Sequence, residues 1–575
     1  MRFRKTSAGL TVQATCGSYV VMLGMDMPES ECAGLLGFAI HRTDPAQQEA
    51  IWMEGMKCFE ASDPGFPPGA RYRTREHPIQ GFTWSDFTAK PGRTYTYRVL
   101  AMYGTPEALQ PKKTVELTVR TEDFSEGAHG VFFNRGAAAS QEYVRRFGNR
   151  SMAGATADDP RWAWLSRGAA EAIENFVGRA AGAGWGLRVA AYEFRSKRVA
   201  NALREAIDRG VAVEILYDAN ANKPNKKTGE VFPRDQNRAT AKSAGLDAVC
   251  TERITRSDVK APPIAHSKII VLLKDGKPQA VLTGSTNFSD GGMFGQSNVV
   301  HVVNDAVIAG AYLQYVELLS SNPAHNDLQE TLTASIALPA TSPRVGTSVV
   351  FSPRQDTDAL DWYAGLAAGA DQSLFMTFAF GMNAIFQNAY MHGNAPLRYA
   401  LLDKQLGPGV KKDKKEAETQ KMIDLARMNE NRIAIGNRLN LTAFDGWLKE
   451  TLTGLNEHVR FIHTKYMLIN PLGDDPIVIT GSANFSAASS NDNDENMLVI
   501  RGDQRVADIY LGEYMRLWNH YAFRQWANSS AAKDKRPKFL RPDDSWTQRY
   551  FQDTDQGRQR ALFVSSPAST LSKDG

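Results

Sequence analysis

The pattern HSKIIVLL (266–273) followed by AVLTGSTNFS (280–289) occurs twice in this chain, since it returns as HTKYMLIN (463–470) followed by IVITGSANFS (477–486). In both copies the His and the Lys are two residues apart, the Ser of GS lies 19 residues beyond the His, and the Asn lies 21 beyond it. The apolar runs predict two buried strands joined by a turn in each copy. Residues i and i+2 of a strand point to the same face, so we expect each His and its Lys to lie on one face.

The polar residues of the two copies form a set that suits phosphate chemistry. The set is His266, Lys268, Ser285, Asn287, His463, Lys465, Ser482 and Asn484. Imidazoles serve as nucleophiles and proton carriers, while Lys, Ser and Asn donate hydrogen bonds to the oxygens of a phosphate. The glycine before each Ser allows a close approach of the backbone to a ligand. This chemistry needs no metal cluster and no cofactor, and we expect neither.

On these residues the chain resembles the phospholipase D superfamily, whose signature is HxK, a spacer and GSxxN, present twice around one active site. A lone HxK is expected by chance in many proteins, whereas two copies with identical spacing are not. The family usually has an Asp five residues after the Lys, and here those positions hold Leu273 and Asn470. Asp275 and Asp474 lie just beyond them, in the expected turns. The departure puts the turn structure in doubt more than the catalytic set.

The resemblance implies a two-step displacement in which one His attacks phosphorus and the other protonates the leaving oxygen, then activates water. The lysines and asparagines would hold the equatorial oxygens. Thirteen residues past each GS serine lie Asn298 and Glu495, and in family members a carboxylate near this place orients a His, typically that of the opposite half. We therefore expect Glu495 to serve His266 as nucleophile, with His463 as acid and base. If the pairing stays within one half, the two roles are exchanged.

The order of apolar segments predicts an α/β fold with two pseudo-twofold-related halves, each a sheet flanked by helices, preceded by a small all-β sandwich. The strand 186–194, the helix 196–210 and the strand 211–220 predict a parallel pair with a right-handed crossover. We place the halves at 123–350 and 351–530, with the site between them. A segment 405–432 is an insertion whose KKDKK run is interpreted as a solvated face.

Residues 1–122 carry short β-rich runs separated by Pro, Gly and Asp, which predict a β-sandwich. GFTWSDFTAKPGRTYTYRVLAMYG (81–104) is similar to the late strands of fibronectin type III domains, with Tyr95, Tyr97 and Val99 in the characteristic alternation. The resemblance implies an adhesive or positioning role, and a plain structural appendage is the alternative. The tail 531–575 is polar, and we expect loose packing there.

Composition sets few limits on function. The chain has 575 residues, so several domains are expected at roughly 150 residues each. Its net charge of +4 does not by itself indicate nucleic acid or a membrane surface, and its four Cys show no CxxC spacing. No run is long and apolar enough to span a bilayer, and MRFRKTSAGL has no apolar segment after its positive charges. We therefore expect a cytoplasmic protein.

The motif indicates a phosphodiester but does not identify what flanks it. One chain with both halves resembles the bacterial phospholipases D more than nucleases that must dimerise, so no oligomer is required and a phospholipid is favoured, with peripheral membrane contact as a consequence. The basic stretch NKPNKKTGEVFPRDQNR (222–238), interpreted as a loop over the site, favours nucleic acid instead. Phosphatidyl transfer needs the same residues. A non-catalytic binding or tethering protein is the alternative of another class.

Overall fold

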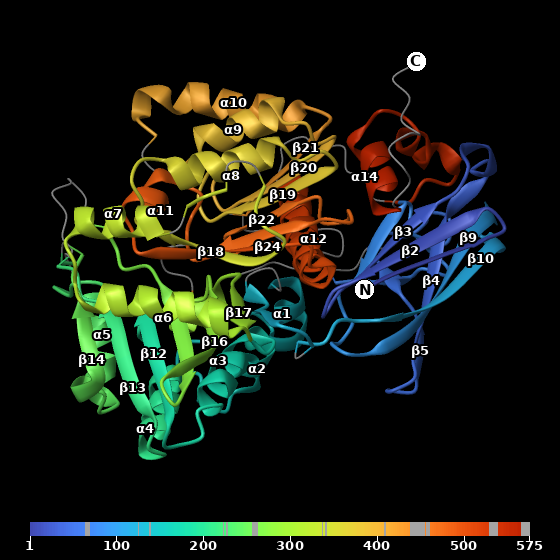
Figure 1. Cartoon of the computed structure of the whole chain (residues 1–575). Coiled ribbons are helices and arrows are strands. Elements are labelled where there is room, and N and C mark those ends of the chain that lie inside the picture. Colours follow the sequence, from blue (N-terminus) through green and yellow to red (C-terminus); the bar gives the residue numbers. More distant parts are fainter. Residues whose placement is uncertain are drawn as a thin grey trace.

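The computed structural model describes the chain except residues 64–68, 125, 137–139, 222–223, 226–227, 256–262, 336, 340–341, 408–409, 437–454, 456–460, 528–538 and 565–575. Two mixed sheets, one above the other in Figure 1, carry helices on their faces, and an all-β region lies beside them. The expected fold class, an α/β protein with two sheet-and-helix halves after an N-terminal all-β region, is confirmed.

The first half is a seven-stranded sheet with order β11-β17-β16-β15-β12-β13-β14. Its strands are β11 (His129–Phe133), β12 (Trp185–Ala191), β13 (Ala212–Asp218), β14 (Cys250–Arg253), β15 (Lys268–Lys274), β16 (Lys277–Gly284) and β17 (Val299–Val303). β12 is parallel to β13 with the helix α4 (Lys197–Asp208) between them in sequence, which confirms the expected parallel pair. The helix is followed by Gly210 at φ 89°, a conformation that favours glycine.

The second half repeats this plan strand for strand, in the order β18-β24-β23-β22-β19-β20-β21. Its strands are β18 (Gly346–Ser352), β19 (Ser373–Phe378), β20 (Leu397–Leu402), β21 (Asn431–Ile435), β22 (Tyr466–Ile469), β23 (Ile477–Gly481) and β24 (Glu495–Arg501). Each motif copy supplies the antiparallel pair β15/β16 or β22/β23. The duplication of the motif is therefore a duplication of the whole sheet.

Helices cover both sheets (Figure 1). In the first half they are α1 (Ser140–Phe147), α2 (Pro160–Ser166), α3 (Ala169–Gly178), α4, α5 (Arg234–Ser243), α6 (Ala306–Ser320) and α7 (His325–Ser335), with short turns η3 (Asp247–Val249) and η4 (Gly291–Gly295). In the second they are α8 (Asp358–Ala368), α9 (Ala384–His392), α10 (Lys415–Arg427), α11 (Ala487–Asn491) and α12 (Gln504–Ala527), with η5 (Lys412–Lys414). The expected loop 222–238 contains the start of α5, and Lys223, Lys226 and Lys227 lie outside the described residues.

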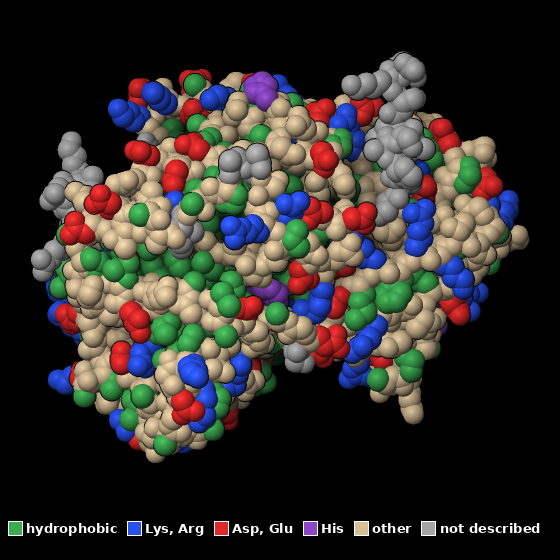
Figure 2. Space-filling model, viewed as in Figure 1, with side chains coloured by type: hydrophobic (Ala, Val, Ile, Leu, Met, Phe, Trp, Pro, Cys, Tyr) green, Lys and Arg blue, Asp and Glu red, His purple; other side chains and the backbone are tan. Residues whose placement is uncertain are grey.

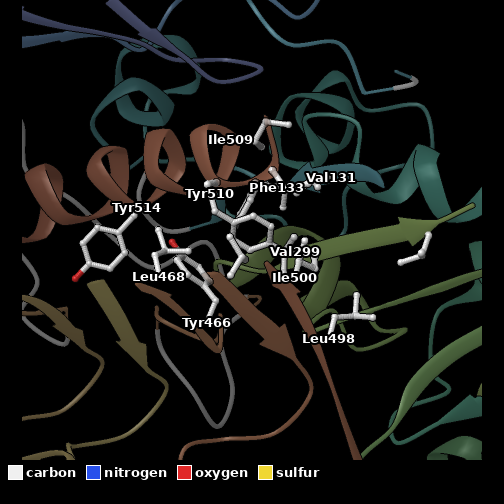
Figure 3. Packing of buried hydrophobic residues seen from close by; sticks show 14 of the residues in the cluster. Val131, Phe133, Val299, Tyr466, Leu468, Leu498, Ile500, Ile509, Tyr510 and Tyr514 are labelled. Atoms are coloured by element: carbon white, nitrogen blue, oxygen red, sulfur yellow. The ribbon is translucent and has the colours of Figure 1, made fainter. Parts of the chain in front are cut away.

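One apolar core joins the two halves. In Figure 3 side chains of the first sheet, such as Phe133, meet Tyr466 of the second sheet and Tyr510 of α12. The ring centroids of Phe133 and Tyr510 are 5.1 Å apart, and those of Tyr466 and Tyr510 are also 5.1 Å apart. A core that fuses both halves holds any site between them rigidly.

The N-terminal region consists of two four-stranded sheets with orders β1-β2-β3-β8 and β10-β9-β4-β5. The strands are β1 (Arg2–Ser7), β2 (Leu10–Cys16), β3 (Val21–Asp26), β4 (Leu35–Asp44), β5 (Glu49–Trp52), β8 (Thr83–Asp86), β9 (Thr94–Thr105) and β10 (Ala108–Arg120), beside the small pair β6 (Glu54–Gly55) and β7 (Tyr72–Arg73) and the turn η1 (Glu29–Glu31). Tyr95, Tyr97 and Val99 of β9 are buried between the sheets. The fibronectin type III resemblance and the domain boundaries stay predictions.

The C-terminal segment is packed more tightly than the polar composition of the tail led us to expect. Residues 539–564 form η6 (Asp544–Trp546), η7 (Gln548–Tyr550) and α14 (Asp555–Phe563), which lie against the β-sandwich in Figure 1. Trp546 is 5% exposed, lies in the core of the sandwich and donates its Nε1–H to the Leu35 carbonyl at 2.9 Å. A few buried aromatic side chains therefore outweigh the polar composition. Residues 531–538 and 565–575 of the expected tail lie outside the described residues.

We predict that Trp546→Ala lowers the free energy of unfolding by about 3 kcal/mol, because the substitution removes a buried indole and its hydrogen bond. Chemical denaturation measures the change. Trp526→Ala is the matched control, since Trp526 is 41% exposed and its loss should cost less than about 1 kcal/mol. Equal costs for the two variants would show that the C-terminal segment is not docked in solution.

Candidate active site

Both motif histidines lie in the segments that lead into the strands, not in the strands themselves. β15 begins at Lys268 and β22 at Tyr466, so the expectation that strand alternation aligns His and Lys was wrong. Buried carboxylates hold these segments instead. Asp218 accepts the Ala265 N–H at 2.8 Å, and Asp403 accepts the N–H groups of Phe461 and Ile462 at 3.0 Å.

Each histidine segment pairs with the opposite half of the protein. The Asp494 N–H donates to the Ile264 carbonyl at 3.0 Å. In the related place the Ser297 N–H donates to the Phe461 carbonyl at 2.8 Å, and the His463 N–H donates to the Ser297 carbonyl at 3.2 Å. These backbone bonds bring His266 next to the start of β24 and His463 next to the start of β17.

His266 is oriented by Glu495, the residue at the register position thirteen past Ser482. The distance from His266 Nδ1 to Glu495 Oε2 is 2.8 Å, and both side chains are buried. The hydrogen bond crosses between the halves, as in the arrangement that the sequence favoured. A carboxylate at Nδ1 selects the tautomer that leaves Nε2 free and stabilises positive charge on the ring.

His463 is oriented by a neutral amide. Its Nδ1 lies 2.8 Å from Oδ1 of Asn298, which crosses between the halves in the opposite direction. The amide is fixed because Asn298 Nδ2 donates to the Gly292 carbonyl at 2.8 Å, and the Ser285 hydroxyl donates to Asn298 Oδ1 at 2.8 Å. The two histidines are therefore related by symmetry in position but not in charge environment.

The centroids of the two imidazole rings are 6.4 Å apart, and the rings are arranged edge to face with an interplanar angle of 75°. Burial, followed by the charges of Lys268 and Lys465, lowers the pKa of both histidines well below its ordinary value. Both rings are consequently neutral at physiological pH, with lone pairs available for bonding or proton transfer. Burial also raises the pKa of Glu495 to about 7, against the opposing effect of Lys268.

The lysines lie directly behind the histidines. Lys268 Nζ donates to the carbonyl of His266, and Lys465 Nζ donates to that of His463 at 2.6 Å. Each lysine is 1% exposed. Burial lowers the pKa of Lys268 to about 7. Burial, followed by the charge of Lys268, lowers the pKa of Lys465 well below its ordinary value.

A cavity of about 680 Å³ opens above the two imidazoles. His266, His463, Asn287 and Asn484 line it, so the amides lie where they can donate to a ligand. Ser285 and Ser482 do not line it. Both are fully buried, and their hydroxyls accept the N–H groups of Val299 at 3.1 Å and Asn496 at 3.0 Å. The structure thus places the two serines, which we expected to contact substrate, as supports for Asn298 and for β24.

Sequence reasoning missed several residues of the site. Tyr192 packs on His266 with ring centroids 4.9 Å apart, and Glu193, Arg195 and Phe232 line the cavity. The signal for the first three was the polar run YEFR directly after the buried strand β12. Asp218 and Asp403 were also missed, although β13 and β20 both end with an apolar run that is followed by an Asp, ILYD in the first half and ALLD in the second.

The two positions at which the family usually has an Asp, Leu273 and Asn470, lie at the ends of the motif strands that are remote from the histidines. Asn470 Oδ1 accepts the N–H groups of Gln372 and Ser373 at 2.9 and 3.1 Å, which fixes the start of β19. Leu273 is buried in the first half, and Asp275 takes the turn with φ 47°. Neither position reaches the histidines.

Within the described part of the chain, no group of three or more His, Cys, Asp and Glu side chains is arranged to hold a metal ion. The four cysteines form no disulfide with one another.

We predict that the affinity of the cavity for sulfate falls as the pH rises through about 7, where Lys268 loses its proton. Sulfate keeps the same charge across this pH range, so a loss of affinity reports a change in the charge of the protein alone. In Lys268→Arg the fall should shrink, because a guanidinium stays charged. Isothermal titration calorimetry measures both proteins, and an affinity that is constant with pH in the unmodified chain would contradict the prediction.

Comparisons with known proteins agree with this geometry. Residues 181–319 and 414–518, which include both motif copies, match the family model described as cardiolipin synthase, PLD-like domain. No curated protein sequence matches the chain. Among solved structures, phosphatidylserine synthase of Haemophilus influenzae Rd KW20 is 11% identical, with a TM-score of 0.43, over 62% of this chain and 85% of its own.

The phospholipase D family member Nuc of Salmonella typhimurium is 23% identical, with a TM-score of 0.20, over 26% of this chain and 86% of its own. Polyphosphate kinase of Porphyromonas gingivalis is 12% identical, with a TM-score of 0.35, over 60% of this chain and less than half, 46%, of its own length. The two segments that build the paired-histidine site are thus similar to a PLD-like domain.

Proposed function

We propose that this chain is a phosphodiesterase that cleaves its substrate through a phosphohistidine intermediate, with a phospholipid as the favoured substrate. The observation that carries the proposal is the pair of neighbouring imidazoles, each fixed at Nδ1 by a residue of the opposite half. Such a pair offers one nucleophile and one proton carrier on opposite sides of a phosphorus atom.

His266 is the nucleophile in this proposal. When Nε2 attacks phosphorus, positive charge develops on the ring, and the Glu495 carboxylate at Nδ1 stabilises that charge. Tyr192 adds a ring face at 4.9 Å and holds the imidazole in place. A neutral amide at this position would give less stabilisation of the phosphohistidine.

His463 is the acid and base. The amide oxygen of Asn298 fixes its tautomer without adding a negative charge, so a proton on Nε2 is given up readily. The first step uses the protonated form of His463, in which Nδ1–H donates to Asn298 and Nε2 carries the second proton. That Nε2 proton passes to the leaving oxygen, and the P–O bond breaks as the bond from His266 Nε2 forms. In the second step His463 takes a proton from water, whose oxygen displaces His266 and yields a phosphomonoester and free enzyme.

The remaining phosphate oxygens lie between two lysines and two amides. Asn287 and Asn484 line the cavity, and Lys268 and Lys465 provide positive charge from beneath it. Charge that builds up on the oxygens in the transition state raises the proton affinity of these lysines, which burial lowers in the free protein. The positive charge of the two lysines is thus more favourable in the transition state than in the free protein.

The cavity is lined by polar and apolar residues of both halves. Glu193, Arg195 and Asp290 of the first half are charged, and each half contributes apolar side chains, such as Phe232 and Phe380. A neighbouring recess of about 540 Å³ shares Phe380, Asn484, Ser486 and Ala488 with the cavity. Its further lining includes the apolar residues Phe378, Met382, Leu406 and Phe485, and also the charged residues Lys411, Lys414 and Glu418.

The aromatic and aliphatic side chains of this recess suit an acyl or alkyl group, and Lys411 and Lys414 can interact with a phosphate beside it. Nucleic acid is less well supported, because Arg195 is paired with Glu193 at 2.6 Å and on the face in Figure 2 basic and acidic side chains are interspersed. Transfer to an alcohol uses the same groups and is the second form of the reaction that this site supports.

Within the described residues no helix is both long and apolar enough to cross a membrane. Peripheral membrane contact and a cytoplasmic location stay predictions.

The roles of the two histidines are tested by trapping. With a nitrophenyl phosphodiester, whose leaving group needs no proton, His463→Asn should complete the first step and stall before the second, so that phosphate accumulates on His266. Acid-quenched mass spectrometry detects it. His266→Asn should show no phosphoprotein, and Glu495→Gln should lower the rate without a change in folding.

Phosphate found on Lys or Ser would overturn the mechanism. Its accumulation on His463 in the His266→Asn protein would exchange the roles of the two histidines.

The substrate class is tested by comparing phospholipid vesicles, single-stranded DNA and the nitrophenyl diester, all in the presence of EDTA. We expect turnover of the lipid and of the small diester, with no loss caused by the chelator. Met382→Gln in the recess should raise KM for the lipid severalfold and leave turnover of the small diester unchanged, since only the lipid reaches the recess. Preferential cleavage of DNA would contradict the lipid assignment, and activity lost in EDTA and restored by a divalent ion would contradict the histidine chemistry.

A further inference from the structure

A second cavity, of about 680 Å³, lies between the β-sandwich and the C-terminal segment and shares no lining residue with the reaction cavity. Its cationic lining is Lys57 from the sandwich side and Arg541 and Arg549 from the C-terminal segment. Pro78, Ile79 and Trp546 provide apolar walls. The cavity therefore combines positive charge from two parts of the chain that are more than 480 residues apart in sequence.

Hydrogen bonds hold the two sides of this cavity together. The Leu540 N–H donates to the Cys58 carbonyl at 2.9 Å, which sets Lys57 beside Arg541. The Gln80 side chain donates to the Arg541 carbonyl at 2.8 Å and accepts the Arg541 N–H at 2.9 Å. Arg549 lies in η7 between the buried residues Trp546 and Tyr550. The three cations are therefore brought together by a fixed backbone frame.

No carboxylate is among the described residues that line the cavity, and the one carboxylate beside it that senses Arg541, the exposed Asp543, lies outside the lining. Nearby arginines are paired differently: Arg42 contacts Asp86 at 2.7 Å, and Arg560 contacts Asp26. Burial and the charges of Arg549 and Arg541 lower the pKa of Lys57, so the groups repel one another as they stand. Cations held close together without an acid are stabilised by an anion from solution.

We propose that Lys57, Arg541 and Arg549 form a binding site for a phosphate monoester group. Two planar guanidinium groups and one ammonium group supply donors in several directions, which matches the three terminal oxygens of a monoester. Ser545 and Gln548 add polar groups to the lining, and Ile79 and Trp546 add an apolar wall beside the phosphate. The group is carried either by a lipid such as phosphatidic acid or by a small soluble molecule.

This site does not depend on the proposed reaction. Its residues belong to the β-sandwich and to the C-terminal segment, whereas both histidines lie in the segments that lead into β15 and β22. A bound phosphate would join these two parts and so strengthen the attachment of the N-terminal region.

The first test uses the unmodified chain. An amine-acylating reagent modifies exposed lysines, and mass spectrometry of the peptides gives the rate for each one. Inorganic phosphate should slow the modification of Lys57 roughly tenfold and leave that of Lys5, an exposed lysine of β1, unchanged. Equal slowing by potassium chloride at the same ionic strength, or no slowing by phosphate, would overturn the proposal.

The second test uses variants on a Lys268→Gln/Lys465→Gln background, in which the reaction cavity has lost its lysines. Calorimetric titration with inorganic phosphate should show a remaining site that Lys57→Gln/Arg549→Gln weakens roughly tenfold. Lys5→Gln/Lys277→Gln is the matched control, since it removes the same charge at two exposed positions. If the control variant loses phosphate affinity to the same extent, the binding depends on net charge alone, and the proposal is overturned.

The two sources of the phosphate group are separated by vesicles. Phosphatidylcholine vesicles that contain phosphatidic acid are sedimented with the unmodified chain and with Lys57→Gln/Arg549→Gln. Sedimentation that depends on the two cations, and protection of Lys57 by the vesicles, assigns a lipid phosphate. Protection by inorganic phosphate with no effect of the vesicles assigns a soluble phosphate. Absence of both effects overturns the site.

Discussion

The hydrogen bond between His266 and Glu495 is the interaction on which the arrangement of the site depends. It joins a residue of the first half to a residue of the second at 2.8 Å in a fully buried place. Asn298 and His463 make the reciprocal contact. Because both bonds run between halves, neither half holds its own histidine in a defined tautomer when alone. The site therefore exists only when the two sheets are docked.

That docking is held by apolar packing and by backbone pairing. The core around Phe133, Tyr466 and Tyr510 contains side chains of both sheets and of α12 (Figure 3). The segments before β15 and β22 each hydrogen-bond to the strand entry of the opposite half. A change in the relative position of the halves would alter both His contacts at once, since a hydrogen bond weakens steeply with distance and angle.

The two halves differ at the positions that hydrogen-bond to the histidines. Positions thirteen past the two GS serines hold Glu495 and Asn298, so one imidazole faces a carboxylate and the other an amide. In the proposed mechanism, this difference gives the two histidines distinct tasks.

The sequence by itself determined the two-half plan, the strands of each motif and the set of polar residues, because apolar periodicity and short spacings are local properties of a chain. It also indicated Glu495 through its register. Only the tertiary structure decided that the His contacts cross between halves, that Ser285 and Ser482 are buried supports, and that Asp218 and Asp403 hold the histidine segments. It also decided that residues 539–564 dock on the β-sandwich through Trp546. Each of these depends on contacts between residues far apart in sequence, and such contacts are set by the packing and burial of the whole molecule.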